Sequence, residues 1–411
     1  MKPTKTLFLM TLFIFLFSLF IGCSSPTSSD DPPPPSSLSY TGKTLPAGLM
    51  GFPYEQNLAS ATGASGISYT IASGSTLPAG FSLSSGGMLT GTPNAVAANA
   101  KFSVTASATG YTSATADFSF SIDFLAMVSI PGGTFMMGSP AGEYNRYSGS
   151  EAQHSAEISD FEMSIYPITQ AQFERIMGFN LSYHQGAALP AGLANGDKLP
   201  VEMVTWFDAV AFCNALSDEE HLTKVYAISG ESYNPAGNII AATVTATFAN
   251  NGYRLPTETE WEYACRGSYA NKATETDTKP FGLGDGTKME YGLANFDTHF
   301  PYDVAQGGEY NDPAGPGYKD STSEVGSYGA NNYGLYDMHG NVWEWCWDWH
   351  NNALPTNPPK DYEGPASSPS SSRLARGGAY GPAKNLRSAH RQFSIDPSYA
   401  YKDTGFRVVR R

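Results

Sequence analysis

The chain has 411 residues, of which 41% are hydrophobic and 15% are charged, a composition typical of globular rather than disordered proteins. Its formal net charge of −14 argues against a nucleic-acid partner, because phosphate binding needs a basic patch. The length is enough for two or three domains, and the many Gly, Ser, Thr and Tyr residues favour β-structure and long loops. No Cys-x-x-Cys pair is present, so a structural zinc site is not indicated.

The N-terminal residues have the pattern of a secretory targeting segment. Two lysines precede an apolar run over residues 7–21, which is too short for a comfortable membrane span. The run ends in Leu19-Phe-Ile-Gly-Cys23, which resembles the bacterial lipobox, in which the cysteine is acylated and becomes the mature N-terminus. We expect a signal peptide over residues 1–22 and a lipid, palmitate included, on Cys23. An ordinary signal peptide or an uncleaved anchor is the alternative.

The segment over residues 23–37 is rich in Ser and Pro and contains four consecutive prolines. Such a segment cannot bury a core, so we expect an extended tether between the lipid and the folded part of the chain. A lipid and a tether together predict display from a membrane, at the cell surface or outer membrane.

Residues 38–123 have the pattern of a small all-β domain. Runs such as Phe102-Ser-Val-Thr-Ala106 and Phe118-Ser-Phe-Ser-Ile122 alternate with a period near two, between turn signals. The length suits a sandwich of about seven strands. The stretch Gly87-Met-Leu-Thr-Gly-Thr-Pro93 resembles the immunoglobulin-like domains of bacterial surface proteins. Because no titratable cluster is present, we interpret this domain as a spacer rather than a ligand-binding domain.

Residues 124–411 form the second predicted domain. Residues 127–138 suggest two strands around a Pro-Gly-Gly turn, and residues 161–169 another strand. The long, aperiodic stretch over residues 267–332 is expected to be functional or held by a metal ion. Three amphipathic helices are expected, each after a threonine that can serve as its N-cap. These threonines are Thr169, Thr205 and Thr257.

Two clusters in this domain invite a catalytic interpretation, and both have a structural one. Glu258, Glu260 and Glu262 alternate along a predicted helix, so they cannot all share a face, and we expect them to cap and solvate its N-terminus. Four alternating tryptophans over residues 343–349 fit a strand with one buried side better than a cofactor site.

Five motifs stand in order along the second domain. They are Ile130-Pro-Gly-Gly-Thr-Phe135, Pro200-Val-Glu-Met-Val-Thr-Trp206, Tyr253-Arg-Leu-Pro-Thr-Glu-Thr-Glu-Trp-Glu-Tyr-Ala264, Tyr333-Gly-Leu-Tyr-Asp-Met-His-Gly-Asn-Val-Trp-Glu-Trp345, and Arg376-Gly-Gly378 with Gly405-Phe-Arg407. This arrangement resembles the formylglycine-generating-enzyme (sulfatase-modifying factor) family over the whole of residues 124–411. The resemblance implies a mixed α+β, loop-rich, C-type-lectin-like domain, here preceded by the immunoglobulin-like sandwich.

The resemblance also allows a test for catalysis. Enzymatic members bind copper through two cysteines in the segment after Arg-Gly-Gly. Here Pro382 replaces the first cysteine, Ala379 replaces the active-site serine, and no cysteine stands in the shortened stretch 383–386. Because Cu(I) needs thiolate or thioether ligands, we expect no copper and no formylglycine-generating activity. The iron-binding ergothioneine-type branch is not expected either, since the seven histidines show no metal-binding spacing.

The family also implies a structural Ca²⁺ site around the Gly-Asn-x-Trp-Glu motif. Carried over, its ligands are Asp337, the carbonyls of Gly340 and Val342, and Glu344. Hard oxygen ligands in a loop suit Ca²⁺. The alternative is that the two carboxylates only cap backbone groups. A second family site would begin at Asn295, but its downstream aspartate is not identifiable.

The C-terminal stretch between Arg376 and Arg407 mixes aromatic and small polar residues without a helical or strand period, which is typical of a recognition surface. Its framework resembles the variable proteins diversified by retroelements, which include lipoproteins of treponemes. We therefore expect a monomeric lipoprotein that binds a protein or glycan here. A formylglycine-type enzyme with an altered active site and a purely structural lipoprotein are the alternatives. The expected contact residues are Tyr380, Gly381, Pro382, His390, Gln392, Phe393, Ser394, Tyr399, Tyr401 and Lys402.

Overall fold

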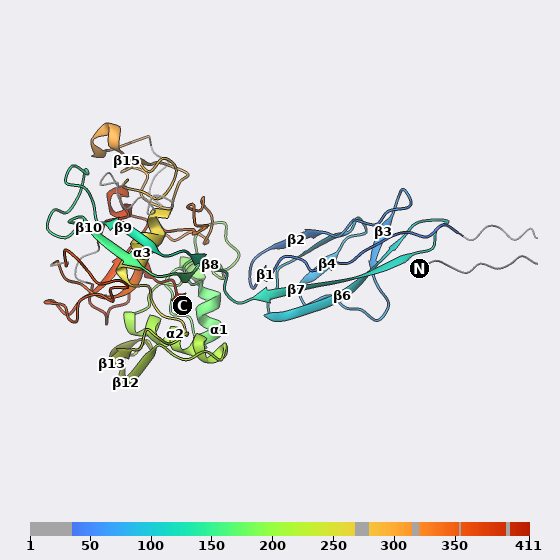
Figure 1. Ribbon diagram of the computed structural model, residues 1–411, viewed down its shortest axis with the longest axis horizontal. Coiled ribbons are helices and arrows are strands. Elements are labelled where there is room, and N and C mark those ends of the chain that lie inside the picture. The colour runs from blue at the N-terminus through green and yellow to red at the C-terminus, as the bar shows by residue number, and fades with distance from the viewer. Residues whose placement is uncertain (1–34, 268–278, 315–319, 353–354, 392–394) are drawn as a thin grey trace, which may run out of the picture.

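The computed structural model describes residues 35–267, 279–314, 320–352, 355–391 and 395–411. A slender β-module is followed by a larger, loop-rich body, with the C-terminus inside that body (Figure 1). The predicted signal peptide, Cys23 and the tether up to residue 34 lie outside the described residues. Within the described ranges, no helix has the length and apolar character needed to cross a bilayer.

The N-terminal module is the two-sheet sandwich that the alternating pattern predicts. One sheet has the order β1-β7-β6-β3 and the other β2-β5-β4. In the long strand β6, Phe102, Val104 and Ala106 are buried while their neighbours are not, because alternate side chains point to opposite faces of a strand. The strands are β1 (Gly48–Leu49), β2 (Tyr54–Asn57), β3 (Ser68–Ile71), β4 (Phe81–Leu83), β5 (Met88–Gly91), β6 (Ala97–Ser107) and β7 (Ala114–Asp123).

The three predicted helices form in the second body, each with a complete capping box. They are α1 (Gln170–Met177), α2 (Trp206–Glu219) and α3 (Glu258–Arg266), capped by Thr169, Thr205 and Thr257. Every residue of α3 is buried, so this helix lies in the centre of the body. The short 3₁₀ helices are η1 (Gly186–Ala188), η3 (Val304–Gln306) and η4 (Ala383–Leu386).

Small sheets surround these helices, in the orders β10-β9, β20-β11-β8, β12-β13, β14-β15-β16 and β18-β17-β19. The two strands predicted around the Pro-Gly-Gly turn exist, but they pair with different partners, β8 with β11 and β9 with β10. The strands are β8 (Met127–Ile130), β9 (Gly133–Met137), β10 (His154–Ile158), β11 (Phe161–Ser164), β12 (Tyr226–Tyr233), β13 (Ile239–Ala246), β14 (Lys288–Met289), β15 (Tyr302–Asp303), β16 (Gly308–Glu309), β17 (Trp343–Trp349), β18 (Arg373–Arg376), β19 (Thr404–Gly405) and β20 (Val409–Arg410).

The tryptophan series forms strand β17, but the prediction of one buried side is wrong. The intervening residues Glu344, Cys346 and Asp348 are buried, and Trp343 and Trp345 on the other side are buried as well. Both faces are covered by other elements. Trp261 and Glu258 of α3 donate to Glu344 and Asp348 on one face, and Trp206 of α2 packs against Trp347 on the other.

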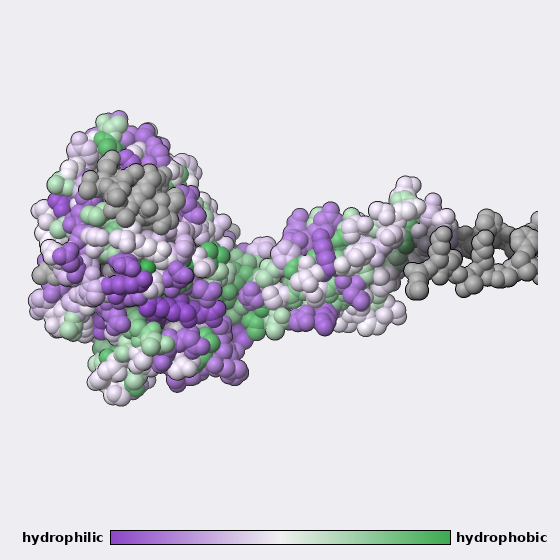
Figure 2. Space-filling model, viewed as in Figure 1, coloured by the Kyte–Doolittle hydropathy of each residue, from purple (hydrophilic) through white to green (hydrophobic). Residues whose placement is uncertain are grey.

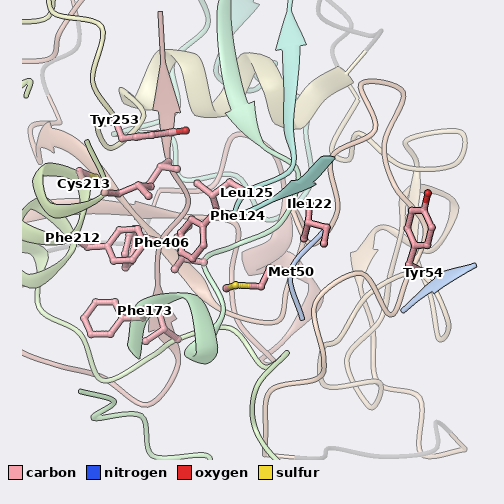
Figure 3. Packing of buried hydrophobic residues seen from close by; sticks show 14 of the residues in the cluster. Met50, Tyr54, Ile122, Phe124, Leu125, Phe173, Phe212, Cys213, Tyr253 and Phe406 are labelled. Carbon is pink, nitrogen blue, oxygen red and sulfur yellow. The ribbon is translucent and has the colours of Figure 1, made fainter. Parts of the chain in front are cut away.

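The junction between the two bodies is packed core rather than a free linker. Phe124 and Leu125 are each 8% exposed, and the backbone oxygen of Phe124 accepts a hydrogen bond from Nε2 of Gln172 at 3.0 Å. Figure 3 shows Phe124 beside Leu125, Phe212 and Phe406 of the larger body. Hydrophobic residues also gather on the surface around this junction (Figure 2).

Candidate functional site

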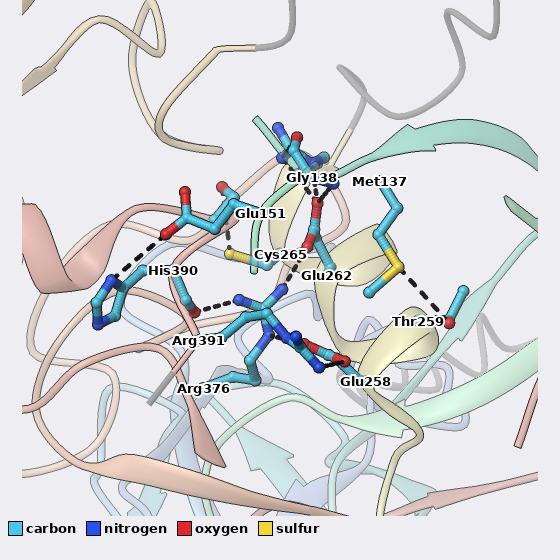
Figure 4. A network of polar contacts seen from close by, with 12 residues as sticks. Met137, Gly138, Glu151, Glu258, Thr259, Glu262, Cys265, Arg376, His390 and Arg391 are labelled. Atoms are coloured by element: carbon cyan, nitrogen blue, oxygen red, sulfur yellow. Dashed lines mark hydrogen bonds and ion pairs between the residues drawn. The ribbon is translucent and has the colours of Figure 1, made fainter. Parts of the chain in front are cut away.

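Buried arginines attach the C-terminal segment to helix α3. The guanidinium of Arg391 donates to both carboxylate oxygens of Glu258, at 2.6 and 2.9 Å. Arg376 pairs with the same glutamate at 3.5 Å and also donates to Glu262 (Figure 4). These side chains are at most 3% exposed. Two helical carboxylates therefore fix the two ends of the stretch 376–391, and we call these pairs the buried ion-pair framework.

The three glutamates of α3 were expected to cap and solvate its N-terminus, and only the capping is confirmed. Glu260 accepts from the backbone nitrogen of Thr257 and completes the capping box. The glutamates are not solvated, since Glu258, Glu260 and Glu262 are 2%, 1% and 1% exposed. Burial by itself raises the pKa of Glu258, but the guanidiniums of Arg391 and Arg376 outweigh it and hold that pKa below its ordinary value. The three glutamates do not all share one face, as expected. Arg376 contacts both Glu258 and Glu262, which are four positions apart, and Arg254 contacts Glu260.

Glu260 and Glu262 complete this pattern. Glu260 accepts two hydrogen bonds of 2.6 Å from Arg254, and Glu262 accepts from Arg266 at 2.7 and 2.9 Å. Charge-assisted pairs of this geometry are strong when both partners are desolvated and fully hydrogen-bonded.

Two of the predicted contact residues lie in the interior. His390 is 2% exposed, with its Nδ1 3.7 Å from Oε1 of Glu151, and burial lowers its pKa. Tyr380 is 4% exposed, and its hydroxyl donates to the backbone oxygen of Lys402 at 3.4 Å. The expectation that these two side chains touch a ligand directly is corrected: both support the surface from beneath, because the framework pulls this stretch inward.

Other predicted contact residues do reach the surface. Tyr399 and Tyr401 are 59% and 39% exposed, and their rings stack with centroids 6.1 Å apart. Lys402 is also exposed, with Nζ 2.9 Å from Asp320 and 5.9 Å from the ring centroid of Tyr183. Tyr183 is itself 53% exposed. We call Tyr183, Tyr399, Tyr401 and Lys402 the aromatic platform.

The remaining predicted contact residues differ in their position. Gly381 and Pro382 are half-buried, and the backbone oxygen of Gly381 accepts from the backbone nitrogen of Asp297 at 2.9 Å. Gln392, Phe393 and Ser394 lie outside the described residues. Sequence reasoning missed Tyr183, which is far from the C-terminal stretch along the chain and has no local motif that could have revealed it.

The loop of the predicted calcium site is tightly bent and rich in oxygen atoms. Asp337 adopts a left-handed conformation with φ 57°, and its Oδ2 accepts from the backbone nitrogen of Gly326 at 2.8 Å. Burial raises the pKa of Asp337 to about 6. Gly340 has φ 89°, and a Cβ there would lie 2.4 Å from the backbone oxygen of Asn295, so only glycine fits.

Glu344 is the most constrained member of this loop. It is completely buried, and its two oxygens accept from Arg407 at 2.7 and 2.8 Å and from Nε1 of Trp261 at 2.7 Å. A carboxylate offers about four acceptor positions, so three donors leave room for one more contact. Within the described ranges, no group of three His, Cys, Asp or Glu side chains is arranged to hold a metal ion. A Ca²⁺ ion here would depend on backbone carbonyls as well as Asp337 and Glu344.

The cysteines lie away from the segment where enzymatic relatives carry theirs. Cys213, Cys265 and Cys346 are free and completely buried. Burial raises the pKa of Cys265 to about 12, so it is held as a thiol. A protonated thiol is neither a good nucleophile nor a metal ligand. Of the two positions that the resemblance compares with enzymatic residues, Ala379 is buried and Pro382 is the N-cap residue of η4.

Comparison with known families identifies both parts of the chain. The family described as "Sulfatase-modifying factor enzyme 1-like domain" matches residues 119–411, and the family described as "Putative Ig domain" matches residues 51–123. Chaperone protein LppX of Paenibacillus barcinonensis is 31% identical over 280 residues, which cover 66% of this chain and 86% of that protein. Formylglycine-generating enzyme of Streptomyces coelicolor is 28% identical over 270 residues, 62% of this chain and 78% of that protein.

A solved structure resembles most of the chain. Treponema denticola variable protein 1 matches with a TM-score of 0.53 and 26% sequence identity. The match covers 75% of this chain and 99% of that protein.

Proposed function

The chain belongs to the sulfatase-modifying factor enzyme 1-like family, and from this premise we propose that it is a membrane-anchored surface lipoprotein that binds a ligand. In this proposal residues 379–403 present the binding surface on a non-catalytic, C-type-lectin-like scaffold. Exposed Tyr399 and Tyr401 are the anchors, because aromatic side chains bury a large area at a low cost in conformational entropy.

The contrast between the two sides of the C-terminal segment carries this proposal. Arg376 and Arg391 are fixed in the buried ion-pair framework, whereas the side chains of the aromatic platform are exposed. A rigid scaffold below and adaptable side chains above are what a recognition surface needs. The likeness to Treponema denticola variable protein 1 supports the further proposal that the residues of this surface vary between copies of the gene.

The absence of cysteine from residues 376–411 supports a binding rather than an oxidising role. The likeness to Chaperone protein LppX, the relative named above with the higher identity, favours a protein as the ligand over a glycan.

Two measurements test this proposal. Sequencing the 3′ end of the gene across isolates should find substitutions concentrated in codons 379–403, with the framework arginines unchanged. Uniform sequences would remove the proposal of diversification but not of binding. Binding itself is tested with a panel of surface proteins and glycans, where the double variant Tyr399→Ala/Tyr401→Ala should lose the ligand that the wild type captures. Tyr233→Ala is the matched control, because Tyr233 is 61% exposed and lies on β12 in another region of the sequence.

A catalytic role is the second candidate, because formylglycine-generating enzymes are 28% identical over most of the larger body. Incubation with Cu(I) and a Cys-x-Pro-x-Arg peptide distinguishes the two. We expect no conversion of the peptide cysteine, and turnover would overturn the binding proposal.

We also propose that the lipid on Cys23 attaches the chain to the membrane, that the protein is monomeric, and that Ca²⁺ stabilises the loop of Asp337, Gly340, Val342 and Glu344. Replacing Cys23 with serine should release the protein from the membrane fraction. Light scattering of the lipid-free chain tests the monomer.

A further inference from the structure

The aromatic platform is built from two segments that are far apart along the chain. Tyr183 belongs to the loop between α1 and η1, whereas Tyr399, Tyr401 and Lys402 belong to the C-terminal segment. The two segments meet where Nζ of Lys402 lies 5.9 Å from the ring centroid of Tyr183. A composite surface of this kind needs a rigid support that fixes its parts relative to each other.

Glu202 holds the segment that carries Tyr183. This glutamate is completely buried, and its two carboxylate oxygens accept from the backbone N–H groups of Tyr183 and His184, at 3.0 and 2.9 Å. Nδ1 of His184 lies 3.3 Å from the same carboxylate. The hydroxyl of Ser182 donates to the backbone oxygen of Glu202 at 3.3 Å. Ser182 and His184 are buried, so the loop is fixed on both sides of Tyr183 and only that ring is left exposed.

The partners of Glu202 differ from those of other buried glutamates in the larger body. The glutamates that pair with arginine are Glu151, Glu258, Glu260, Glu262 and Glu344. Among the described residues, neither an arginine nor a lysine forms an ion pair with Glu202. A buried carboxylate needs strong donors, and here backbone N–H groups of the Tyr183 loop supply them. The carboxylate of Glu202 therefore serves this loop and not the buried ion-pair framework.

The residues that follow Glu202 hold the C-terminal segment. The backbone N–H of Met203 donates to the backbone oxygen of Tyr401 at 2.9 Å, and that of Trp206 donates to the backbone oxygen of Pro397 at 3.1 Å. These two hydrogen bonds bracket Tyr399 along the chain. Met203 has φ 58°, a left-handed conformation that is uncommon for residues other than glycine. Such strain clusters at functional sites, where the surrounding structure maintains it.

We propose that Glu202 is a positioning residue of the ligand-binding surface, through which the segment 200–206 holds Tyr183 in register with Tyr399 and Tyr401. This inference rests on the proposed binding function and adds Tyr183 to its anchors. Glu202 touches no ligand itself, because it is completely buried. Its contribution is to keep the platform in one arrangement before a ligand arrives, which reduces the entropy lost on binding.

The arrangement of the platform can be measured without a ligand. 3-Fluorotyrosine placed at position 183 of the full chain gives a single ¹⁹F resonance, whose chemical shift responds to the neighbouring ammonium group of Lys402. Lys402→Met should therefore shift this resonance in the otherwise unchanged chain. In the Glu202→Gln background the same substitution should shift it much less. The glutamine amide presents a donor to one of the two backbone N–H groups, so the loop loses that contact and Tyr183 leaves its place beside Lys402.

Asp361→Asn is the matched control. Asp361 also accepts from a backbone N–H and a hydroxyl, both of Ser159, at 2.7 and 2.8 Å, but Ser159 lies between β10 and β11. In this variant the response of the ¹⁹F resonance to Lys402→Met should equal that of the wild type. A response that stays complete in Glu202→Gln, or that is lost equally in Asp361→Asn, would overturn the proposal.

A second variant covers the case in which Glu202→Gln does not fold. Ser182→Ala removes the hydroxyl that contacts the backbone nitrogen and oxygen of Glu202, at 3.4 and 3.3 Å, and leaves the carboxylate in place. It should reduce the response to Lys402→Met in part, and a complete response would contradict the proposal.

The panel of surface proteins and glycans supplies the functional measurement. Tyr183→Ala and Glu202→Gln should each weaken capture by about tenfold or more, as expected for an anchor residue and for the residue that positions it. Capture that survives Tyr183→Ala but not Tyr399→Ala/Tyr401→Ala would overturn the role of Tyr183. If the wild type captured nothing, the proposed function would fail, whereas loss of the ¹⁹F response in Glu202→Gln would still establish the positioning.

Discussion

Replacing Glu258 with alanine should lower the free energy of unfolding of the larger body by about 3–5 kcal/mol, the usual cost of breaking a buried ion pair. The carboxylate accepts two hydrogen bonds from Arg391, at 2.6 and 2.9 Å, and lies 3.5 Å from Arg376. Each charge-assisted bond contributes roughly 1.5–3 kcal/mol, so two of them agree with the same range. After the substitution, the acceptors left to Arg391 among the described residues are the backbone oxygens of Ser150 and Asn351, at 3.3 and 3.0 Å.

Urea unfolding followed by tryptophan fluorescence measures this cost. All six tryptophans lie at or after Trp206, so their fluorescence reports on the larger body and not on the β-module. Glu219→Ala is the control, because its pair with Arg175 is exposed, with side chains 57% and 39% accessible. That pair should contribute less than about 1 kcal/mol. If both variants lost the same stability, the reasoning that the framework holds the C-terminal segment would be refuted.

Three further results are expected. Burial and the charge of Glu258 raise the pKa of Asp348 to about 7. Between roughly pH 4 and pH 7 the native state therefore binds more protons than the unfolded state. The free energy of unfolding then falls with rising pH, by up to about 1.4 kcal/mol per pH unit. Asp348→Asn should remove this slope in urea unfolding from roughly pH 5 to pH 8, and an unchanged slope would contradict the assignment. Gly340→Ala should lower the free energy of unfolding by more than about 2 kcal/mol, since φ is 89° and the new Cβ would lie 2.4 Å from a backbone oxygen. Gly329→Ala is the control, because a Cβ there meets nothing within 4 Å. In the same denaturation assay it should change the free energy of unfolding by less than about 0.5 kcal/mol. Ca²⁺ should raise the thermal midpoint of the wild type but not of Asp337→Ala, and a midpoint insensitive to both Ca²⁺ and chelator would exclude the calcium site.

Part of the candidate surface was predictable from sequence. The aperiodic mixture around Tyr399, Tyr401 and Lys402 predicts exposure, and these residues are exposed. The same mixture surrounds Tyr380 and His390, which are buried. Composition along a loop does not say which side chains turn inward, because that depends on where distant arginine partners lie.

The sequence by itself determined the local elements and the two-part organisation. An N-cap such as Thr257 and its partner Glu260 act within one turn, so the capping box can be recognised from their spacing and the helix begins where it predicts. The alternation in β6 likewise predicts which of its residues are buried, since strand geometry is local.

Only the tertiary structure decided what the α3 glutamates do. Glu258 and Arg391 are separated by 133 positions along the chain, and no sequence pattern near either residue predicts that they pair. On an isolated helix, three alternating glutamates would be exposed to solvent. In the folded body α3 is surrounded by protein, and a buried charge without a partner costs much free energy. Each carboxylate is therefore paired with an arginine.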